Sequence, residues 1–287
     1  MCGIVGLFLK DPALEPRLGA MAAGMLTVLS DRGPDSAGFA IYGAGAKDTI
    51  KLTLRDPAGG AAFDTLDLPL HRRGDHAVLT IPAEDEAALR ARLARTEIRI
   101  VGAGESMELY KAVGHPSDVA ARFGLPNMSG THAIGHTRMA TESAVTTAGA
   151  HPFSTGRDQC LVHNGSLSNH NGVRRSLRAE GLEFETENDS EVAAGYLTWR
   201  MRQGARLDEA LYSAINDLDG FYTFVVGTQT GFGVLRDPIA CKPAVMAETD
   251  RYVAFGSEYR ALVDLPDIAR AHIWEPEPAK VYFWQRN

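Results

Sequence analysis

The chain opens with MCGIVGLFL (residues 1–9), which places a cysteine directly before a short apolar run. The run ends at Lys10-Asp11-Pro12 and predicts a buried strand. Removal of the initiator methionine, which is usual before a small residue, would leave Cys2 with both a thiol and a free α-amine. Such an amine has a pKa of about 7.7–8.0, so part of it is a neutral base that can take the thiol proton. The stretch therefore indicates a nucleophile at the chain terminus, although a cysteine that merely packs as a small hydrophobe is the commoner case on position alone.

Four polar segments further along the chain indicate a shared site. They are DRGPDS, GHTRMAT, HNGSL and NDSE, at residues 31–36, 135–141, 163–167 and 188–191. Each has an ordinary alternative: Arg138 could form a surface ion pair, Asn164-Gly165 could make a turn, and Asp189 could only cap a helix. Their combined order after Cys2 favours one catalytic site over independent coincidences.

The composition excludes several classes of function. With 29 Lys and Arg against 36 Asp and Glu, the net charge is −7, so the chain lacks the positive field that nucleic acid or an anionic membrane requires. It contains no apolar run of about 18 residues, and its N-terminus lacks the pattern of a signal peptide. Three scattered cysteines indicate a reducing compartment, so we expect a cytoplasmic protein.

The sequence offers no positive support for a metal or cofactor in this chain. It has no CxxC, HExxH or phosphate-loop motif, which argues against zinc, ATP and dinucleotides. His136, His151 and His163 fall near the polar segments, but their spacing is not that of a metal site. We therefore expect these histidines to support loops.

The hydrophobic pattern predicts strands at both ends of the chain and helices between them. Helices are expected at 14–29, 169–179, 190–202 and 207–216, and strands at 4–9, 37–42, 132–137, 160–163, 221–227, 232–235, 244–247, 252–255 and 280–284. This order favours an α+β fold of stacked sheets covered by helices, in a single domain over residues 1–287. Residues 43–130 are interpreted as an inserted α/β segment that could contact a partner, with strands at 76–81 and 98–101 around a helix at 84–95.

These motifs resemble the glutaminase domain of class II glutamine amidotransferases, which are N-terminal nucleophile hydrolases. The similarity covers roughly residues 2–43 and 131–264. It is carried by CGIVG (2–6), RGPDS (32–36), GHTRMAT (135–141), HPF (151–153), HNG (163–165), DSE (189–191) and GSE (256–258). The resemblance implies a four-layer α-β-β-α sandwich, with the inserted segment outside the family pattern.

The resemblance also implies roles for individual residues. Cys2 would attack the γ-amide of glutamine, or of a related γ-glutamyl amide, with Asn164 and Gly165 as the oxyanion hole. The substrate would be bound by Arg138 at its α-carboxylate, by Asp189 at its α-ammonium group and by Thr141 through a hydrogen bond. Arg32 and His163 would support the site.

A narrower resemblance is to the free-standing amidotransferase-like subunit of N-methylglutamate synthase (methylamine–glutamate N-methyltransferase) and related glutamate-synthase-like complexes. It is carried by NDSEVAA (188–194), LDGFY (218–222), LRDPIACKPAVM (235–246) and WEPEP (274–278). It implies glutamate-synthase-like partner subunits that carry FMN, with an iron–sulfur cluster on a partner as a further option. That enzyme joins methylamine to glutamate and releases ammonia. Two alternatives stay open: a non-catalytic structural subunit that retains Met1, and a stand-alone amidohydrolase acting on another amide.

Overall fold

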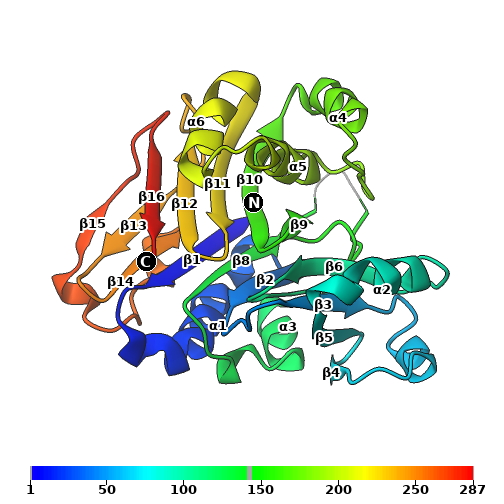
Figure 1. Ribbon diagram of the computed structural model, residues 1–287. Helices are drawn as coiled ribbons and strands as arrows, with labels where there is room; N and C mark the ends of the chain where they lie inside the picture. The colour runs from blue at the N-terminus through cyan, green and yellow to red at the C-terminus, as the bar shows by residue number, and fades with distance from the viewer. Residues whose placement is uncertain (1, 141–143, 287) are drawn as a thin grey trace.

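The computed structural model describes residues 2–140 and 144–286. In this part of the chain, two large sheets face each other and a third, smaller sheet lies to one side (Figure 1). Helices cover the outer face of each large sheet. The element order mixes strands and helices throughout, as expected for the α+β class.

The first large sheet has seven strands, with the N-terminal strand in its interior. Its order is β15 (His272–Trp274), β13 (Val245–Glu248), β14 (Tyr252–Gly256), β1 (Gly3–Leu9), β8 (His132–Arg138), β2 (Ser36–Tyr42) and β7 (Met107–Val113). All seven residues of β1 are buried, as its apolar run predicts. Gly3 pairs with Thr137 of the antiparallel strand β8, so Cys2 and Arg138 lie at the same end of this sheet.

The second large sheet has five strands in the order β16 (Val281–Gln285), β12 (Gly231–Arg236), β11 (Gly220–Gly227), β10 (Gln159–Leu167) and β9 (Phe153–Gly156). It packs face to face against the first sheet through apolar side chains of both, including Ile4, Val225 and Phe232. Gly6 allows this close approach, because a Cβ atom there would lie 2.6 Å from the Phe232 ring.

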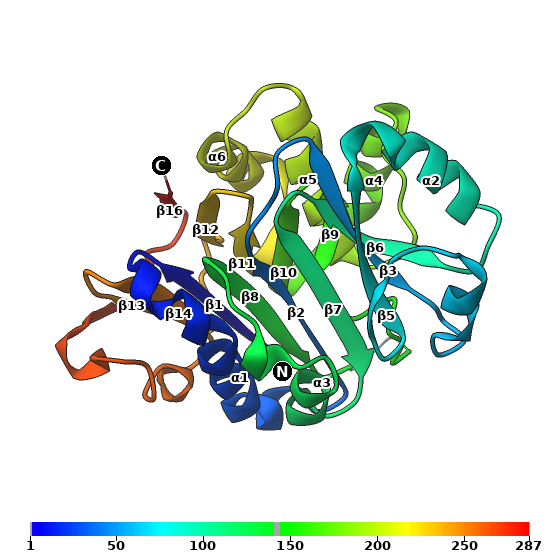
Figure 2. The same ribbon diagram turned by 60° about the horizontal axis from the view of Figure 1, so that its bottom comes forward.

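The outer layers are helical, as Figures 1 and 2 show. α1 (Leu18–Val28) and α3 (Pro116–Arg122) share an apolar core with the seven-stranded sheet. α5 (Asp189–Arg202) and α6 (Leu207–Asp217) share another with the five-stranded sheet, and α4 (His170–Ala179) packs on α5. The layer order α-β-β-α confirms the predicted four-layer sandwich. None of the helices formed by the described residues is long and apolar enough to cross a membrane.

The segment from residue 43 to residue 130 divides into two parts. A separate four-stranded sheet contains β4 (His71–Arg73), β5 (His76–Pro82), β3 (Thr49–Arg55) and β6 (Arg99–Gly104), and α2 (Glu86–Leu93) shares its apolar core. The strand, helix and strand expected between residues 76 and 101 are therefore confirmed. β7 and α3 instead belong to the main sandwich. We call the part with the separate sheet, residues 49–104, the side sheet.

Candidate active site

The ends of β1, β8 and β10 converge on one cleft. Its volume is about 850 Å³, and Cys2, Arg138, His163, Asn164, Gly165 and Asp189 all line it. We call it the Cys2 cleft. The structure therefore brings together the residues that the sequence assigned to nucleophile, oxyanion hole and substrate recognition. Thr141, also assigned to substrate binding, lies outside the described residues.

Cys2 is held from two sides through its backbone. Arg32 Nε donates a hydrogen bond to the Cys2 carbonyl oxygen at 3.0 Å, and Asn164 Nδ2 donates to the same oxygen at 3.3 Å. The thiol is only partly buried, with Sγ 4.0 Å from the Met139 carbonyl oxygen. The main chain at Cys2 is thus fixed while its thiol faces the cleft.

A second set of contacts holds Arg32 and the start of β1. Arg32 forms an ion pair with Glu258, and Ser257 Oγ accepts a hydrogen bond from the Ile4 N–H at 2.9 Å. Burial raises the pKa of Glu258, but hydrogen bonds from Arg32 and Arg260 outweigh this effect, so its pKa lies below the usual value. Glu258 therefore stays ionised near neutral pH and keeps the Arg32 guanidinium in place.

Asn164 and Gly165 lie within β10, where they pair with Thr223 and Tyr222 of β11. The alternative of a simple turn at this dipeptide is therefore wrong. Gly165 has a φ of +151°, and a Cβ atom there would lie 2.0 Å from the Phe221 carbonyl oxygen. Only glycine fits this backbone position, which leaves the peptide beside Asn164 open to the cleft.

Arg138 is the last residue of β8 and is only 7% exposed. This burial excludes the alternative of a surface ion pair. The segment at residues 31–36 fixes the strand end, since the Asp35 N–H donates to the Arg138 carbonyl oxygen at 3.0 Å and Asp35 Oδ2 accepts from the Ala140 N–H at 2.8 Å. The guanidinium of Arg138 is thus presented to the cleft by a rigid strand.

Asp189 is the first residue of α5, but it does not cap the helix. The N-cap is Asn188, whose side chain accepts a hydrogen bond from the Ser190 N–H at 2.9 Å. Asp189 Oδ2 instead accepts from the Leu167 N–H at 2.8 Å, which ties α5 to the end of β10. The carboxylate lines the Cys2 cleft at the positive end of the helix dipole, where an anion is stabilised.

His163 lies on β10 and supports the start of α5. Its Nδ1 is 2.8 Å from Ser190 Oγ and 3.9 Å from Asp189 Oδ1. Burial lowers the pKa of His163, although the Asp189 charge acts in the opposite direction, so the imidazole is neutral at neutral pH. Its contacts make it a positioning residue for Asp189.

The other two histidines near the cleft are buried and stacked on one another. The ring centroids of His136 and His151 are 3.9 Å apart with an interplanar angle of 12°. Burial lowers the pKa of His136 to about 3, and it lowers that of His151 as well. Within residues 2–140 and 144–286, no group of three or more His, Cys, Asp or Glu side chains is placed to hold a metal ion.

Some lining residues were not found by sequence reasoning. Phe221 is the exposed second residue of β11, and Lys242 Nζ lies 4.9 Å from the centre of the Phe221 ring. Both line the Cys2 cleft. They sit in the LDGFY and LRDPIACKPAVM stretches, which were used only for the overall resemblance. Neither residue type indicates a binding site in the sequence by itself. Phe221 and Lys242 lie on separate segments and come together only when β11 and β12 pair.

Comparison with known proteins places the chain in a family. A family model described as a glutamine amidotransferase domain matches residues 136–264. Glutamine amidotransferase-like protein GlxB of Rhizobium meliloti (strain 1021) is 63% identical over 100% of this chain and 99% of its own length. A putative glutamine amidotransferase of Methanothermobacter thermautotrophicus is 33% identical over 98% of this chain and 99% of its own length.

The fold also occurs in a solved enzyme, glutamine phosphoribosylpyrophosphate amidotransferase from B. subtilis, with a TM-score of 0.64 and 21% sequence identity. The similarity covers 99% of this chain but 47% of that enzyme, so this chain spans about half its length. The sandwich is therefore the fold of the amidotransferases of the N-terminal nucleophile type. By its full-length relatives, the chain belongs to the glutamine amidotransferase family.

Proposed function

We propose that this protein hydrolyses the γ-amide of glutamine through a thioester on Cys2. The observation that carries the proposal is the placement of Asn164 and Gly165 beside Cys2, with Asn164 Nδ2 3.3 Å from the Cys2 carbonyl oxygen. The glutamine amidotransferase family supplies the substrate class. Removal of Met1 is part of the proposal, because it frees the α-amine that acts as the base.

The reaction follows from the groups in the cleft. The Cys2 α-amine takes the thiol proton, and the thiolate attacks the amide carbon of glutamine. The oxygen of the tetrahedral intermediate carries a negative charge, which the Asn164 side-chain amide and the Gly165 N–H stabilise. The C–N bond then breaks, the nitrogen takes the proton from the α-amine, and ammonia leaves. Water attacks the thioester, which releases glutamate and restores the thiol.

Substrate recognition uses two opposite charges that line the cleft. The Arg138 guanidinium can bind the glutamine α-carboxylate with two parallel hydrogen bonds. Asp189, with a side chain 21% exposed, offers a carboxylate to the α-ammonium group. Thr141, which lies outside the described residues, is proposed as a further hydrogen-bonding residue for the substrate.

We further propose that this chain is a subunit of a glutamate-synthase-like complex such as N-methylglutamate synthase, which joins methylamine to glutamate and releases ammonia, with FMN carried by a partner subunit. The support is the resemblance of the 188–194, 218–222, 235–246 and 274–278 stretches to the subunit of that enzyme. Purification of the tagged protein from its native host tests this point. Co-purifying subunits with flavin absorbance are expected, whereas a flavin-free homogeneous protein would contradict it.

The glutaminase proposal itself is tested with 6-diazo-5-oxo-L-norleucine, an electrophilic mimic of glutamine. We expect one covalent adduct on Cys2, located by peptide mass spectrometry, and none in Cys2→Ser. Cys241 is exposed and serves as an internal control for non-specific alkylation. Labelling of Cys241 without Cys2 would argue for the structural-subunit alternative.

A further inference from the structure

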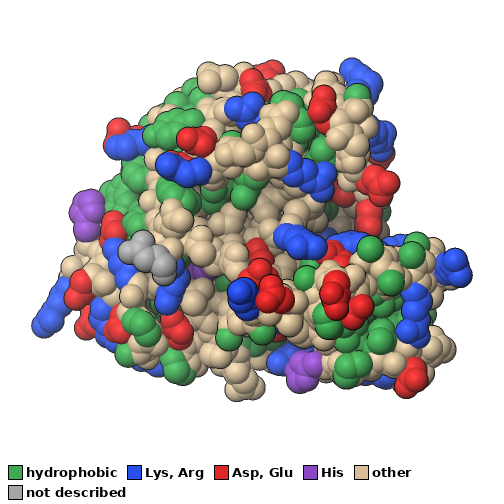
Figure 3. Space-filling model, in the orientation of Figure 1, with side chains coloured by type: hydrophobic (Ala, Val, Ile, Leu, Met, Phe, Trp, Pro, Cys, Tyr) green, Lys and Arg blue, Asp and Glu red, His purple; other side chains and the backbone are tan. Residues whose placement is uncertain are grey.

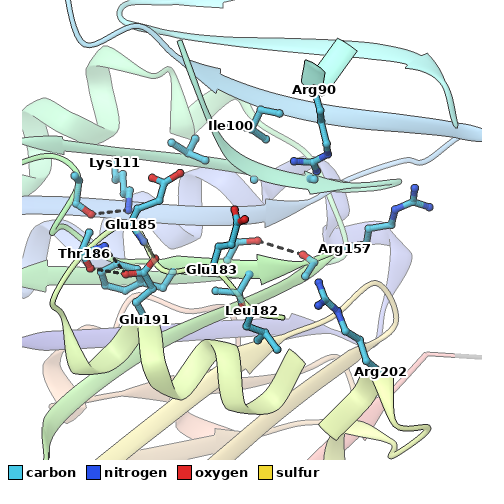
Figure 4. Close-up of a pocket in the computed structure, with 18 of the residues that line it drawn as sticks. Arg90, Ile100, Lys111, Arg157, Leu182, Glu183, Glu185, Thr186, Glu191 and Arg202 are labelled. Atoms are coloured by element: carbon cyan, nitrogen blue, oxygen red, sulfur yellow. Dashed lines mark hydrogen bonds between the residues drawn. The ribbon is translucent and has the colours of Figure 1, made fainter. Parts of the chain in front are cut away.

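A second cavity lies behind the loops that line the Cys2 cleft. Its volume is about 520 Å³, within the range of small-molecule sites. β6 and α2 of the side sheet form one wall, and β9 with the segment leading into α5 forms the other (Figure 4). In Figure 3 the surface is hollowed between the side sheet and the layer of α4 and α5. We call this space the side cavity.

Two loops separate the side cavity from the Cys2 cleft, and a lysine that lines the side cavity holds the first of them. Lys111 is 6% exposed, and its Nζ donates to the carbonyl oxygens of Ala148 and Ala150 at 3.1 and 2.9 Å. Burial lowers the pKa of Lys111 to about 8, so the side chain remains mainly charged at neutral pH. Gly149 and His151, on the same loop, line the Cys2 cleft. Lys111 therefore anchors, from behind, a loop that shapes the proposed glutamine site.

The second loop, which leads into α5, is held in the same manner by a glutamate. Glu191 is 6% exposed, and its carboxylate accepts hydrogen bonds from the Glu185 and Thr186 N–H groups, both at 2.8 Å. Thr186 lines both cavities, and Asp189 lies three residues further along. Two buried charges of the side cavity thus fix both loops that separate it from the Cys2 cleft.

The remaining charges of the side cavity form two poles. Arg90, Arg157 and Arg202 lie together on one side, whereas Glu183 and Glu185 point into the cavity nearer Lys111 (Figure 4). Glu86 pairs with Arg90 and Arg157 and so neutralises only part of the arginine pole. Within the described part of the chain, the side chains of Arg202 and Glu183 make no hydrogen bond or ion pair, which leaves both available to a ligand.

We propose that the side cavity binds a small α-amino acid, with its carboxylate at the arginine pole and its ammonium group at Glu183 and Glu185. A zwitterion matches both poles, whereas a simple anion would place no positive charge opposite the two glutamates. The cavity opens between the side sheet and the sandwich, so a ligand there contacts both parts of the molecule.

Occupancy of the side cavity controls the Cys2 cleft, a part of the inference that rests on the proposed function. A ligand that binds Glu185 also acts on the approach to Asp189, because Glu191 ties the 185–186 segment to α5. Coupling of this kind is reciprocal, so a substrate analogue in the Cys2 cleft must change the affinity of the side cavity by the same factor.

Isothermal titration calorimetry of the full chain tests the site, with L-glutamate, L-alanine and L-lysine as probes. We expect at least one probe to bind the Arg138→Ala variant, in which the Cys2 cleft is impaired. Arg202→Ala and Glu183→Ala should each weaken that binding about tenfold or more, because each removes a charged partner. Arg178→Ala, an exposed arginine in the last turn of α4, is the matched control and should leave it unchanged. The corresponding dicarboxylate, glutarate, should bind at least about tenfold more weakly than L-glutamate.

Hydrogen–deuterium exchange reports the coupling. The bound probe should slow exchange at residues 146–152 and 185–187 in the wild-type protein but not in Arg202→Ala. If no probe binds, or if Arg138→Ala abolishes all binding while Arg202→Ala retains it, the side-cavity proposal is overturned and the glutaminase proposal is untouched. Binding that depends on Arg202, together with a Cys2 that resists the diazo-ketone, would instead overturn the glutaminase proposal alone.

Discussion

Replacement of Asn164 by alanine tests the oxyanion hole directly. Asn164 is 4% exposed, and one of its two side-chain amide hydrogens is used in the 3.3 Å hydrogen bond to the Cys2 carbonyl oxygen. The second is available to the charge that develops on the substrate. Alanine removes both donors and introduces neither a charge nor additional bulk.

The expected loss is large in catalysis and small in stability. Removal of one oxyanion donor typically lowers kcat by about 10²–10³-fold, or about 2.7–4 kcal/mol of transition-state stabilisation. Loss of the hydrogen bond to Cys2 costs about 0.5–1.5 kcal/mol of folding free energy. KM for glutamine should change little, since Arg138 and Asp189, the residues proposed to bind the two ends of the substrate, are untouched.

The assay is glutamate release at saturating glutamine, with the rate of Cys2 alkylation by the diazo-ketone as a second readout. Asn127→Ala is the matched control, because Asn127 is exposed on the short 125–127 helix and its change should leave both rates intact. A folded Asn164→Ala protein with an unchanged kcat would show that Asn164 is not an oxyanion donor.

Three further perturbations follow from the same structure. Gly165→Ala should abolish glutamine hydrolysis, because its Cβ atom would lie 2.0 Å from a backbone oxygen. Gly181→Ala is the control and should retain activity, since Gly181 also has a positive φ but has open space around it. Equal activities of the two variants would contradict the predicted clash. Lys111→Met should lower the free energy of unfolding, measured in urea, by about 1–3 kcal/mol, since the buried carbonyl oxygens of Ala148 and Ala150 lose their donor. Lys47→Met, at an exposed position, is the control and should leave the stability unchanged. Equal stability of the two variants would argue that Lys111 does not anchor the loop. Burial holds the pKa of His132 and His136 at about 3 in the folded protein, against about 6.5 unfolded, so below pH 6.5 the unfolded chain takes up protons that the folded one does not. The free energy of unfolding should therefore fall by up to about 1.4 kcal/mol per histidine for each pH unit between 6.5 and 3, and a flat stability from pH 6.5 to 5 would contradict this.

Much of the sandwich could be predicted from local patterns. The helix expected at 190–202 is α5, which begins one residue earlier, and the strand at 232–235 is β12, extended by one residue at each end. Long apolar or periodic segments carry enough signal to be assigned alone. β9 and β15 were missed because they have only four and three residues, too few for a period to show.

The sequence indicated many of the residues that line the Cys2 cleft, but not their geometry. Cys2, Arg138 and Asp189 stand at strand or helix ends, where motifs are visible in sequence. The φ of +151° at Gly165 and the use of Asn188, not Asp189, as the helix cap depend on pairings between distant segments. The side cavity was invisible for the same reason, since its walls come from the side sheet and from the segment before α5.

Glutaminase chemistry at Cys2 is tested most directly by the intact mass of the protein from its native host, before and after treatment with 6-diazo-5-oxo-L-norleucine. A catalytic Cys2 requires a mass that is lower than that of the full sequence by one methionine residue and, after treatment, a single covalent adduct at Cys2. A protein that retains Met1 and gains no adduct would show that the fold persists without glutaminase chemistry, and would contradict the account.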